Sequence, residues 1–146
     1  MSTFYLDMDG TIAATYDVPD WLPKLRAFDP TPYVEAVPLV NMARLARYLH
    51  KAQQLGHKVG IISWLSKESN AEYDRAVVAA KMEWLSIHLP SVQFDEIKIV
   101  AYGTSKSETV TDALTSVLFD DEERNRAEWK GRAFMPNEIF EVFKAL

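Results

Sequence analysis

The sequence predicts an α/β fold of three layers, in which helices cover both faces of a doubly wound, Rossmann-like parallel sheet. Short apolar runs alternate along the chain with longer segments whose apolar residues recur at helical spacing. Such runs, bounded on both sides by helices, are typical of strands buried in a parallel sheet. No repeat, low-complexity tract or linker divides the 146 residues, so we expect one domain over 1–146.

Five runs are expected to form the strands, the last being the weakest: Thr3–Leu6, Val59–Ile62, Ile97–Ala101, Ser116–Phe119 and Arg132–Phe134. Helices are predicted from Pro38 to Leu49, over Glu72–Leu89, Thr109–Leu114 and Glu122–Trp129, and from Pro136 onward. Pro38 and Pro136 suit the first position of a helix, and Pro90 ends the second one. Six apolar side chains of that second helix are expected to pack inward: Tyr73, Val77, Ala80, Met82, Trp84 and Leu85.

The segment 13–37 departs from this alternation. Its four prolines exclude a long helix, and 25 residues is long for a structureless loop in a compact domain. It also carries aromatic residues, among them Tyr16 and Trp21. We expect a small cap, inserted after the first strand, over the carboxyl edge of the sheet.

Composition excludes several classes of function. The chain has no cysteine, which rules out disulfides and thiolate chemistry, and its three histidines show no metal-binding spacing. A net charge of −5 argues against a general binder of duplex DNA. The first residues lack the basic start of a signal peptide, and the longest apolar stretch, Val59–Leu65, is too short to cross a bilayer. We expect a cytoplasmic protein without a membrane segment.

Polar residues follow several of the predicted strands, at the edge where parallel α/β sheets bind ligands. These residues are Asp7, Asp9, Ser63, Lys106, Asp120 and Asp121. Four crowded carboxylates need a counter-charge, and a hard divalent cation such as Mg²⁺, which prefers oxygen ligands, provides it. Counted with the cation and one lysine, the site would keep a charge of −1, so we expect one carboxylate, that of Asp9, to carry a proton.

Four segments together resemble the motifs of the haloacid dehalogenase superfamily of aspartate-nucleophile phosphatases. Asp7-Met8-Asp9-Gly10-Thr11 resembles the DxDGT signature, and Gly60-Ile61-Ile62-Ser63 the second motif. Lys106 stands fourteen residues before Asp120, where the third motif has its lysine. Asp120-Asp121, with Asn125 four residues after the second aspartate, resembles the DDxxxN form of the fourth motif. The match spans residues 4 to about 125.

The resemblance implies a role for each matching residue. Asp7 would be the nucleophile that forms an aspartyl-phosphate, and Asp9 the general acid and then the base, with its backbone carbonyl among the metal ligands. Asp121 would bind Mg²⁺ beside Asp7, with Asp120 binding or orienting. Ser63 and the amide that follows it would hydrogen-bond the phosphoryl oxygens, and Lys106 would neutralise their charge. The amides of Met8 and Gly10 would complete the phosphate cradle. An acid at Asp9 is typical of the phosphatases of the superfamily.

These expectations lead to a Mg²⁺-dependent phosphomonoester hydrolase acting on a small phosphorylated substrate. The short cap and the motifs resemble the 5′(3′)-deoxyribonucleotidase branch and related phage and bacterial enzymes. Tyr16, Trp21 and Trp64 could stack a nucleobase, or they could hold the cap to the domain. Two alternatives stay open: a phosphatase of polynucleotide ends, and a catalytically silent module used for binding or regulation.

Overall fold

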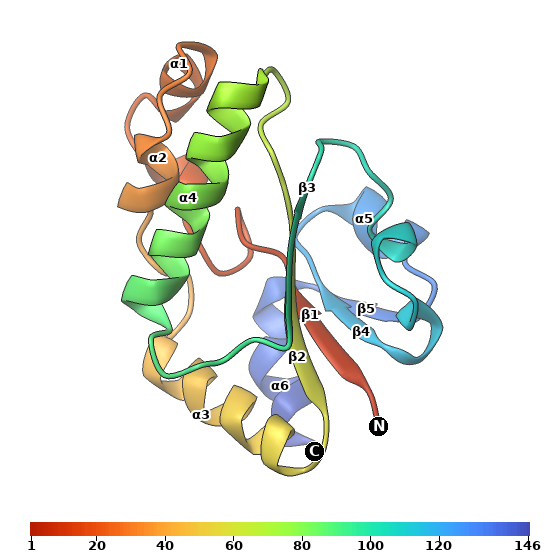
Figure 1. Ribbon diagram of the computed structural model, residues 1–146. Helices are drawn as coiled ribbons and strands as arrows, with labels where there is room; N and C mark the ends of the chain where they lie inside the picture. The colour runs from red at the N-terminus through yellow and green to blue at the C-terminus, as the bar shows by residue number, and fades with distance from the viewer.

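One sheet of five parallel strands, in the order β3-β2-β1-β4-β5, forms the centre of the molecule. The computed structural model describes residues 1–146, and Figure 1 shows the sheet between its helices. The strands are β1 (Thr3–Leu6), β2 (Lys58–Trp64), β3 (Glu96–Val100), β4 (Val117–Phe119) and β5 (Arg132–Phe134). The predicted fold class is confirmed, and each strand lies within a few residues of its predicted bounds.

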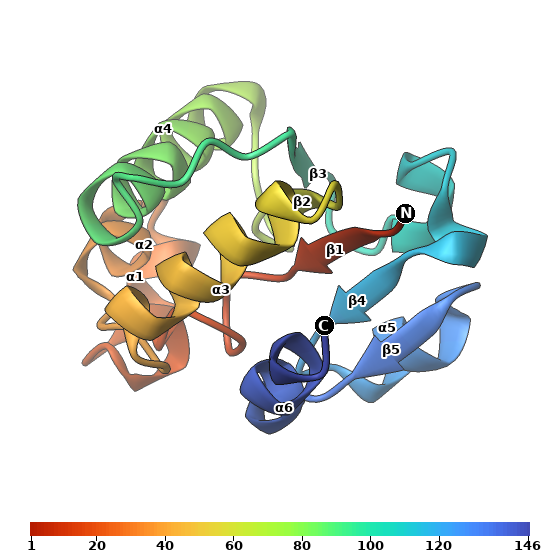
Figure 2. The same ribbon diagram turned by 90° about the horizontal axis from the view of Figure 1, so that it is seen from below.

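Both faces of the sheet are buried, as the apolar runs predicted. Phe4 and Leu6 of β1 belong to the larger hydrophobic core, whereas Tyr5 between them belongs to a smaller core on the opposite face. The helices α3 (Met42–Gln54), α4 (Ala71–His88) and α6 (Ile139–Lys144) contribute to the larger core. Figure 2 shows α3 and α6 across this face, while α5 (Glu123–Glu128) lies on the other side of the sheet. The sheet is therefore doubly wound.

The helix predicted from Pro38 begins later, and this prediction is wrong in its start. Pro38 forms an antiparallel bridge with Ala13, and the amide of Leu39 donates to the carbonyl of Ile12 at 2.8 Å. This pairing holds the chain extended. The helix α3 starts only after Asn41, whose side chain caps it by accepting from the amide of Arg44 at 2.9 Å.

The helix predicted over Thr109–Leu114 is absent. Two short 3-10 helices, η2 (Lys106–Thr109) and η3 (Ala113–Thr115), lie there instead. Asp112 explains the difference, because its carboxylate accepts hydrogen bonds from the hydroxyls of Thr3 and Tyr5, both at 2.7 Å. These bonds hold the segment against β1.

The inner face of α4 differs from the prediction at one position. Met82 was expected to pack inward, but it is 42% exposed, and its neighbour Lys81 is fully buried. The helix places Val77, Lys81 and Leu85 four residues apart on one line, so the buried stripe passes through a lysine. Hydrophobicity alone favours Met82 as the inward-facing residue, whereas the four-residue spacing along the helix places Lys81 there.

The segment 13–37 folds into three short helices, as its prolines require: η1 (Thr15–Asp17), α1 (Trp21–Arg26) and α2 (Thr31–Glu35). Its later part is fixed to α4. The indole of Trp84 donates to the carbonyl of Ala36 at 2.7 Å, and the hydroxyl of Tyr73 donates to the carbonyl of Asp29 at 2.9 Å. In contrast, no residue of α1 is buried. The segment is therefore anchored through α2 and exposed at α1.

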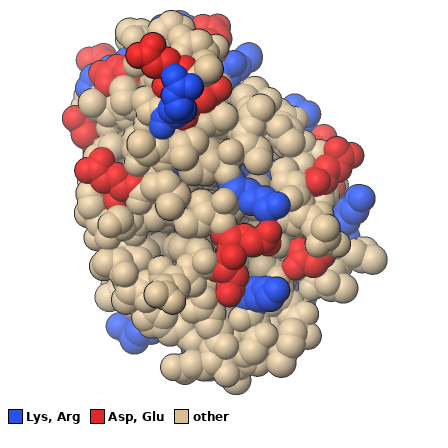
Figure 3. Space-filling view, viewed as in Figure 1, with Lys and Arg blue, Asp and Glu red and all other residues tan.

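Surface charge and helix length bear on two further expectations. Figure 3 shows Lys and Arg side chains scattered among Asp and Glu over one face, without a broad basic area. None of the helices has both the length and the apolar character that crossing a membrane requires.

Candidate active site

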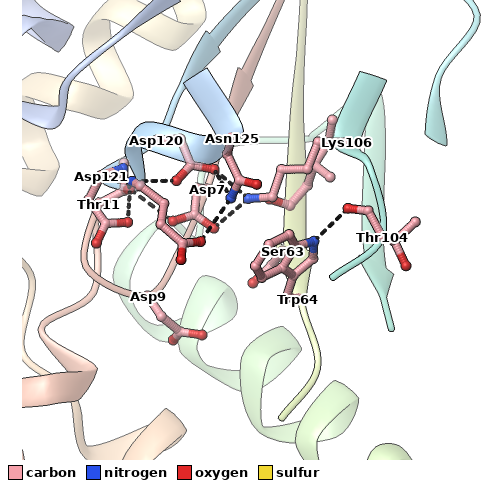
Figure 4. A network of polar contacts seen from close by, with 12 residues as sticks. Asp7, Asp9, Thr11, Ser63, Trp64, Thr104, Lys106, Asp120, Asp121 and Asn125 are labelled. Atoms are coloured by element: carbon pink, nitrogen blue, oxygen red, sulfur yellow. Dashed lines mark hydrogen bonds and ion pairs between the residues drawn. The ribbon is translucent and has the colours of Figure 1, made fainter. Parts of the chain in front are cut away.

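Three aspartates from two strand ends meet at the carboxyl edge of the sheet. Asp7 follows β1, and its backbone amide donates to the carbonyl of Phe119 on the neighbouring β4 at 2.9 Å. Asp120 and Asp121 follow β4 directly. One carboxylate oxygen from each of the three lies within 4.8 Å of the others, and Figure 4 shows the cluster. Sheet pairing thus brings together acids more than a hundred residues apart.

Lys106 neutralises part of this charge. Its buried ammonium donates to Asp7 at 2.8 Å, to Asp120 at 2.7 Å and to the carbonyl of Ile62 at 3.0 Å, which uses all three of its protons. Burial works against the charged form of this lysine, but the charges of Asp7 and Asp120 outweigh it and raise the pKa of Lys106. The lysine is therefore a fixed cation beside the predicted nucleophile.

The turn after β1 holds Asp7 and makes room for Asp121. The hydroxyl of Thr11 donates to Asp7 at 2.9 Å and accepts from the amide of Asp121 at 3.1 Å. Gly10 has a φ of +81°, and a Cβ there would lie 2.3 Å from a carboxylate oxygen of Asp121. Only glycine suits this position, because of both the backbone conformation and the neighbouring carboxylate.

The backbone amides of this turn differ in their availability. Those of Met8 and Asp9 donate no hydrogen bond within the protein. The amide of Gly10, predicted to bind phosphate, instead donates to the carbonyl of Ala13 at 2.8 Å, because the turn closes on itself there. Two free amides thus follow Asp7, at Met8 and Asp9, while Gly10 provides space.

Several donors hold Asp120, whereas the carboxylate of Asp121 accepts only a longer hydrogen bond from the hydroxyl of Thr11, at 3.3 Å. The oxygens of Asp120 accept from the amide of Glu122 at 2.9 Å, from Lys106, and from the side chain of Asn125 at 3.1 Å. Burial and the charge of Asp7 raise the pKa of Asp120 to about 6. The same two causes raise the pKa of Asp121 to about 7. The positive charge around these two carboxylates is thus too small to keep their pKa values at the ordinary level.

Asp9 points away from this cluster, as Figure 4 shows. One of its oxygens accepts from the hydroxyl of Thr15 at 2.6 Å, and the other accepts from the ammonium of Lys81 at 2.8 Å. The lysine is a site residue that the sequence analysis missed. A basic residue on the apolar stripe of α4, four residues from Val77 and from Leu85, was the signal that could have identified it.

Lys81 also explains the surroundings of Ser63. The serine side chain is fully buried and accepts from Lys81 at 2.6 Å, which leaves its own hydroxyl proton without a protein acceptor. The third proton of Lys81 goes to the carbonyl of Trp64 at 2.7 Å. The predicted contact of Ser63 with a phosphoryl group stays a prediction.

The second lysine changes the charge of the site. Four carboxylates, two lysines and one divalent cation together carry no net charge, whereas the sequence analysis counted one lysine. The total charge therefore gives no reason to place a proton on Asp9, and a protonated Asp9 is expected only from its predicted role as general acid. Both oxygens of Asp9 accept hydrogen bonds here.

A cleft of about 450 Å³ opens over these groups and is lined by the acids and by five aromatic side chains. Trp64 packs against Tyr102 with ring centres 4.9 Å apart, and its indole donates to the carbonyl of Thr104 at 2.9 Å. Tyr16 and Trp21 of the segment 13–37 form a second pair, also 4.9 Å apart. Desolvation and the nearby charges of Asp9 and Asp7 raise the pKa of Tyr16. The three predicted aromatic residues thus line the cleft, and Tyr33 and Tyr102 line it as well.

Solved structures of other proteins share this fold. The chain is similar to a D,D-heptose 1,7-bisphosphate phosphatase from Burkholderia thailandensis, with a TM-score of 0.55 and 17% identity over 90% of this chain and 76% of that one. It is also similar to a chain of a Pnkp1/Rnl/Hen1 complex, with a TM-score of 0.57 and 15% identity over 92% of this chain and 45% of that one. No protein-family model matches the sequence, and no curated protein matches it significantly. The chain therefore shares its α/β fold with these two proteins.

The acidic cluster fits a divalent cation. Asp7, Asp120 and Asp121 offer hard oxygen donors within 4.8 Å of one another, which suits Mg²⁺. The raised pKa values of Asp120 and Asp121 also indicate a cation site, because a bound cation would supply the positive charge that these carboxylates lack.

Proposed function

We propose that this chain is a Mg²⁺-dependent phosphomonoester hydrolase that works through an aspartyl-phosphate on Asp7. One observation carries the proposal. The carboxylate of Asp7 is fixed by Lys106 at 2.8 Å and Thr11 at 2.9 Å, beside two further carboxylates and next to two unpaired backbone amides. Such a site joins a positioned nucleophile to donors for a transferring phosphoryl group.

In the first step, an oxygen of Asp7 attacks phosphorus and the bond from phosphorus to the ester oxygen breaks. Protonated Asp9 gives its proton to that oxygen, which leaves as an alcohol. The free amides of Met8 and Asp9 would bind the phosphoryl oxygens, with Ser63 donating its unpaired proton, and the positive charge of Lys106 would offset their negative charge. Asp7 is then an acyl phosphate and Asp9 a carboxylate.

In the second step, water attacks the phosphorus of the aspartyl-phosphate. Asp9 takes a proton from this water, and the bond from phosphorus to the Asp7 oxygen breaks. Inorganic phosphate leaves, Asp7 is a carboxylate again, and Asp9 carries the proton needed for the next cycle. Asp9 thus acts as acid and base in turn.

Asp7 and Asp121 would hold Mg²⁺ together with the backbone carbonyl of Asp9, and Asp120, fixed by Lys106 and Asn125, would orient the site. When bound, the cation offsets the negative charge shared by the carboxylates and the phosphate.

The cleft supports a nucleotide as substrate. The pairs Trp64–Tyr102 and Tyr16–Trp21 come from different segments and line the same cleft as the acids. An aromatic ring stacked on a base contributes about 1–3 kcal/mol. A screen of mononucleotides, sugar phosphates and 3′-phosphorylated oligonucleotides tests this. Preference for mononucleotides supports it, whereas preference for the oligonucleotides favours a phosphatase of polynucleotide ends.

Hydrolysis of an aryl phosphate, with and without Mg²⁺, tests the activity itself. We expect turnover that needs Mg²⁺, stops with a chelator, and is absent in Asp7→Asn. Lys98→Met is a matched control, because Lys98 lies on the edge strand β3 and pairs only with the carbonyl of Thr109 and with Glu96. No hydrolysis by the wild-type chain of any phosphate ester would favour a silent binding module.

A further inference from the structure

We infer that Lys81 is a positioning residue for the general acid Asp9, an inference that rests on the proposed function. Lys81 lies on α4, outside the four motifs that carry the resemblance to phosphatases. Its ammonium contacts Asp9 at 2.8 Å and reaches no other carboxylate. The pair therefore links a helix without catalytic residues to the residue that handles the proton.

Burial makes this contact obligatory. The side chain of Lys81 is 1% exposed, and a buried cation without a partner is strongly unfavourable. Its three protons all have acceptors: Asp9, the hydroxyl of Ser63 and the carbonyl of Trp64. Of these three acceptors only Asp9 can carry a negative charge, which it does in the proposed cycle after its proton has gone to the leaving group. The contact with Asp9 is therefore the one that can offset the unfavourable burial of the Lys81 charge.

Two donors fix both oxygens of Asp9. Thr15 donates to one at 2.6 Å and Lys81 to the other at 2.8 Å, and the Asp9 side chain is 15% exposed. A carboxylate bonded at both oxygens from two directions cannot rotate freely about its side-chain bonds. Without Lys81, a single hydroxyl would define the orientation of the acid.

The three acceptors of Lys81 belong to two different segments of the chain. Asp9 lies after β1, whereas Ser63 and Trp64 end β2. The ammonium also lies 4.9 Å from the centre of the Tyr33 ring in the segment 13–37. Lys81 therefore sets the distance between Asp9 and the end of β2, beside Tyr33 in the lining of the cleft.

The chemical consequence appears when the ester bond breaks. Asp9 gives up its proton and becomes a carboxylate, which Lys81 stabilises at the contact it already makes. An alkyl ester needs this proton because an alkoxide is a poor leaving group, whereas a nitrophenolate departs without help. Loss of Lys81 should therefore affect alkyl esters more than aryl esters.

The experiment measures kcat/KM of Lys81→Met and Lys81→Arg on a nitrophenyl phosphate and on an alkyl phosphate at saturating Mg²⁺. This parameter includes only the steps through phosphoryl transfer to Asp7. For Lys81→Met we expect a loss of about 100-fold on the alkyl ester and a much smaller loss on the aryl ester. Lys81→Arg, which keeps the charge, should recover part of the activity on the alkyl ester. It also provides a variant for the test if Lys81→Met does not fold.

A double-mutant cycle separates positioning from general damage. In an Asp9→Asn background, Lys81→Met should change kcat/KM on the alkyl ester by less than about threefold, because its effect passes through Asp9. Lys98→Met, an exchange at a lysine outside the site, should leave both esters unchanged.

Equal losses on the two esters, or effects of Lys81→Met and Asp9→Asn that multiply, would overturn the inference while leaving the phosphatase intact. A wild-type chain that hydrolyses neither ester would instead contradict the proposed function. The two failures are therefore distinguishable.

Discussion

At the scale of single residues, Gly10 determines whether Asp121 can occupy its place. We predict that Gly10→Ala weakens Mg²⁺ binding at least about tenfold and lowers hydrolysis, because the new Cβ would lie 2.3 Å from an Asp121 oxygen. Titration of activity and of melting temperature with Mg²⁺ measures the effect.

Gly103→Ala is the matched control for this change. Gly103 also has a positive φ, of +84°, but a Cβ there meets nothing within 4 Å. Gly103→Ala should lower the free energy of unfolding by about 1 kcal/mol, through the backbone conformation alone, and should keep the Mg²⁺ affinity of the wild-type chain. Equal Mg²⁺ affinities in the two variants would contradict the role given to Gly10.

Some site residues could be predicted from the sequence, and others could not. Asp7, Asp120 and Asp121 come directly after strands, so a parallel sheet is enough to bring them to one edge. The contact of Lys81 with Asp9 depends on which face of α4 points inward. An error of one residue in that face exchanges Lys81 for Met82. The engaged amide of Gly10 depends on how the turn closes on Ala13, a detail that local residue types do not define.

At the scale of elements, the N-terminus of α4 offers a test. Asn70 caps this helix by accepting from the amide of Tyr73 at 2.8 Å. Asn70→Ala should lower the free energy of unfolding by about 1 kcal/mol, measured by urea denaturation. Hydrolysis should stay unchanged, because Lys81 lies three turns away on a face fixed by Trp84 and Val77. A large loss of activity in the folded variant would show that the cap also supports the site.

The elements themselves were predicted unevenly. Buried strands are marked by apolar runs, and all five were found at nearly the right place. Both wrong helices involve partners that local spacing does not reveal: Pro38 pairs with Ala13, and Asp112 bonds to Thr3 and Tyr5. Long-range pairing overrides helical periodicity in each case.

At the scale of the whole molecule, the acidic cluster makes stability depend on pH and Mg²⁺ together. The pKa values of Asp120 and Asp121 rise from 3.8 to about 6 and about 7 on folding. The folded chain thus binds more protons than the unfolded one between about pH 4 and pH 7, and stability from these groups is lost as pH rises through that range.

We therefore predict that the melting temperature of the metal-free protein falls as the pH is raised from about 5 to about 8. Added Mg²⁺ should raise the melting temperature more at the higher pH, since the cation needs ionised carboxylates. Asp121→Asn should weaken both trends. A melting temperature that rises over this range without Mg²⁺ would contradict the assignment.

Capture of phosphorus by Asp7 is tested most directly by acid quenching during turnover of a nitrophenyl phosphate labelled with radioactive phosphorus. We predict that the label is found on the peptide containing Asp7, that it appears only with Mg²⁺, and that Asp7→Asn abolishes it. Steady hydrolysis by the wild-type chain with label on another residue, or with none on the protein, would contradict the account.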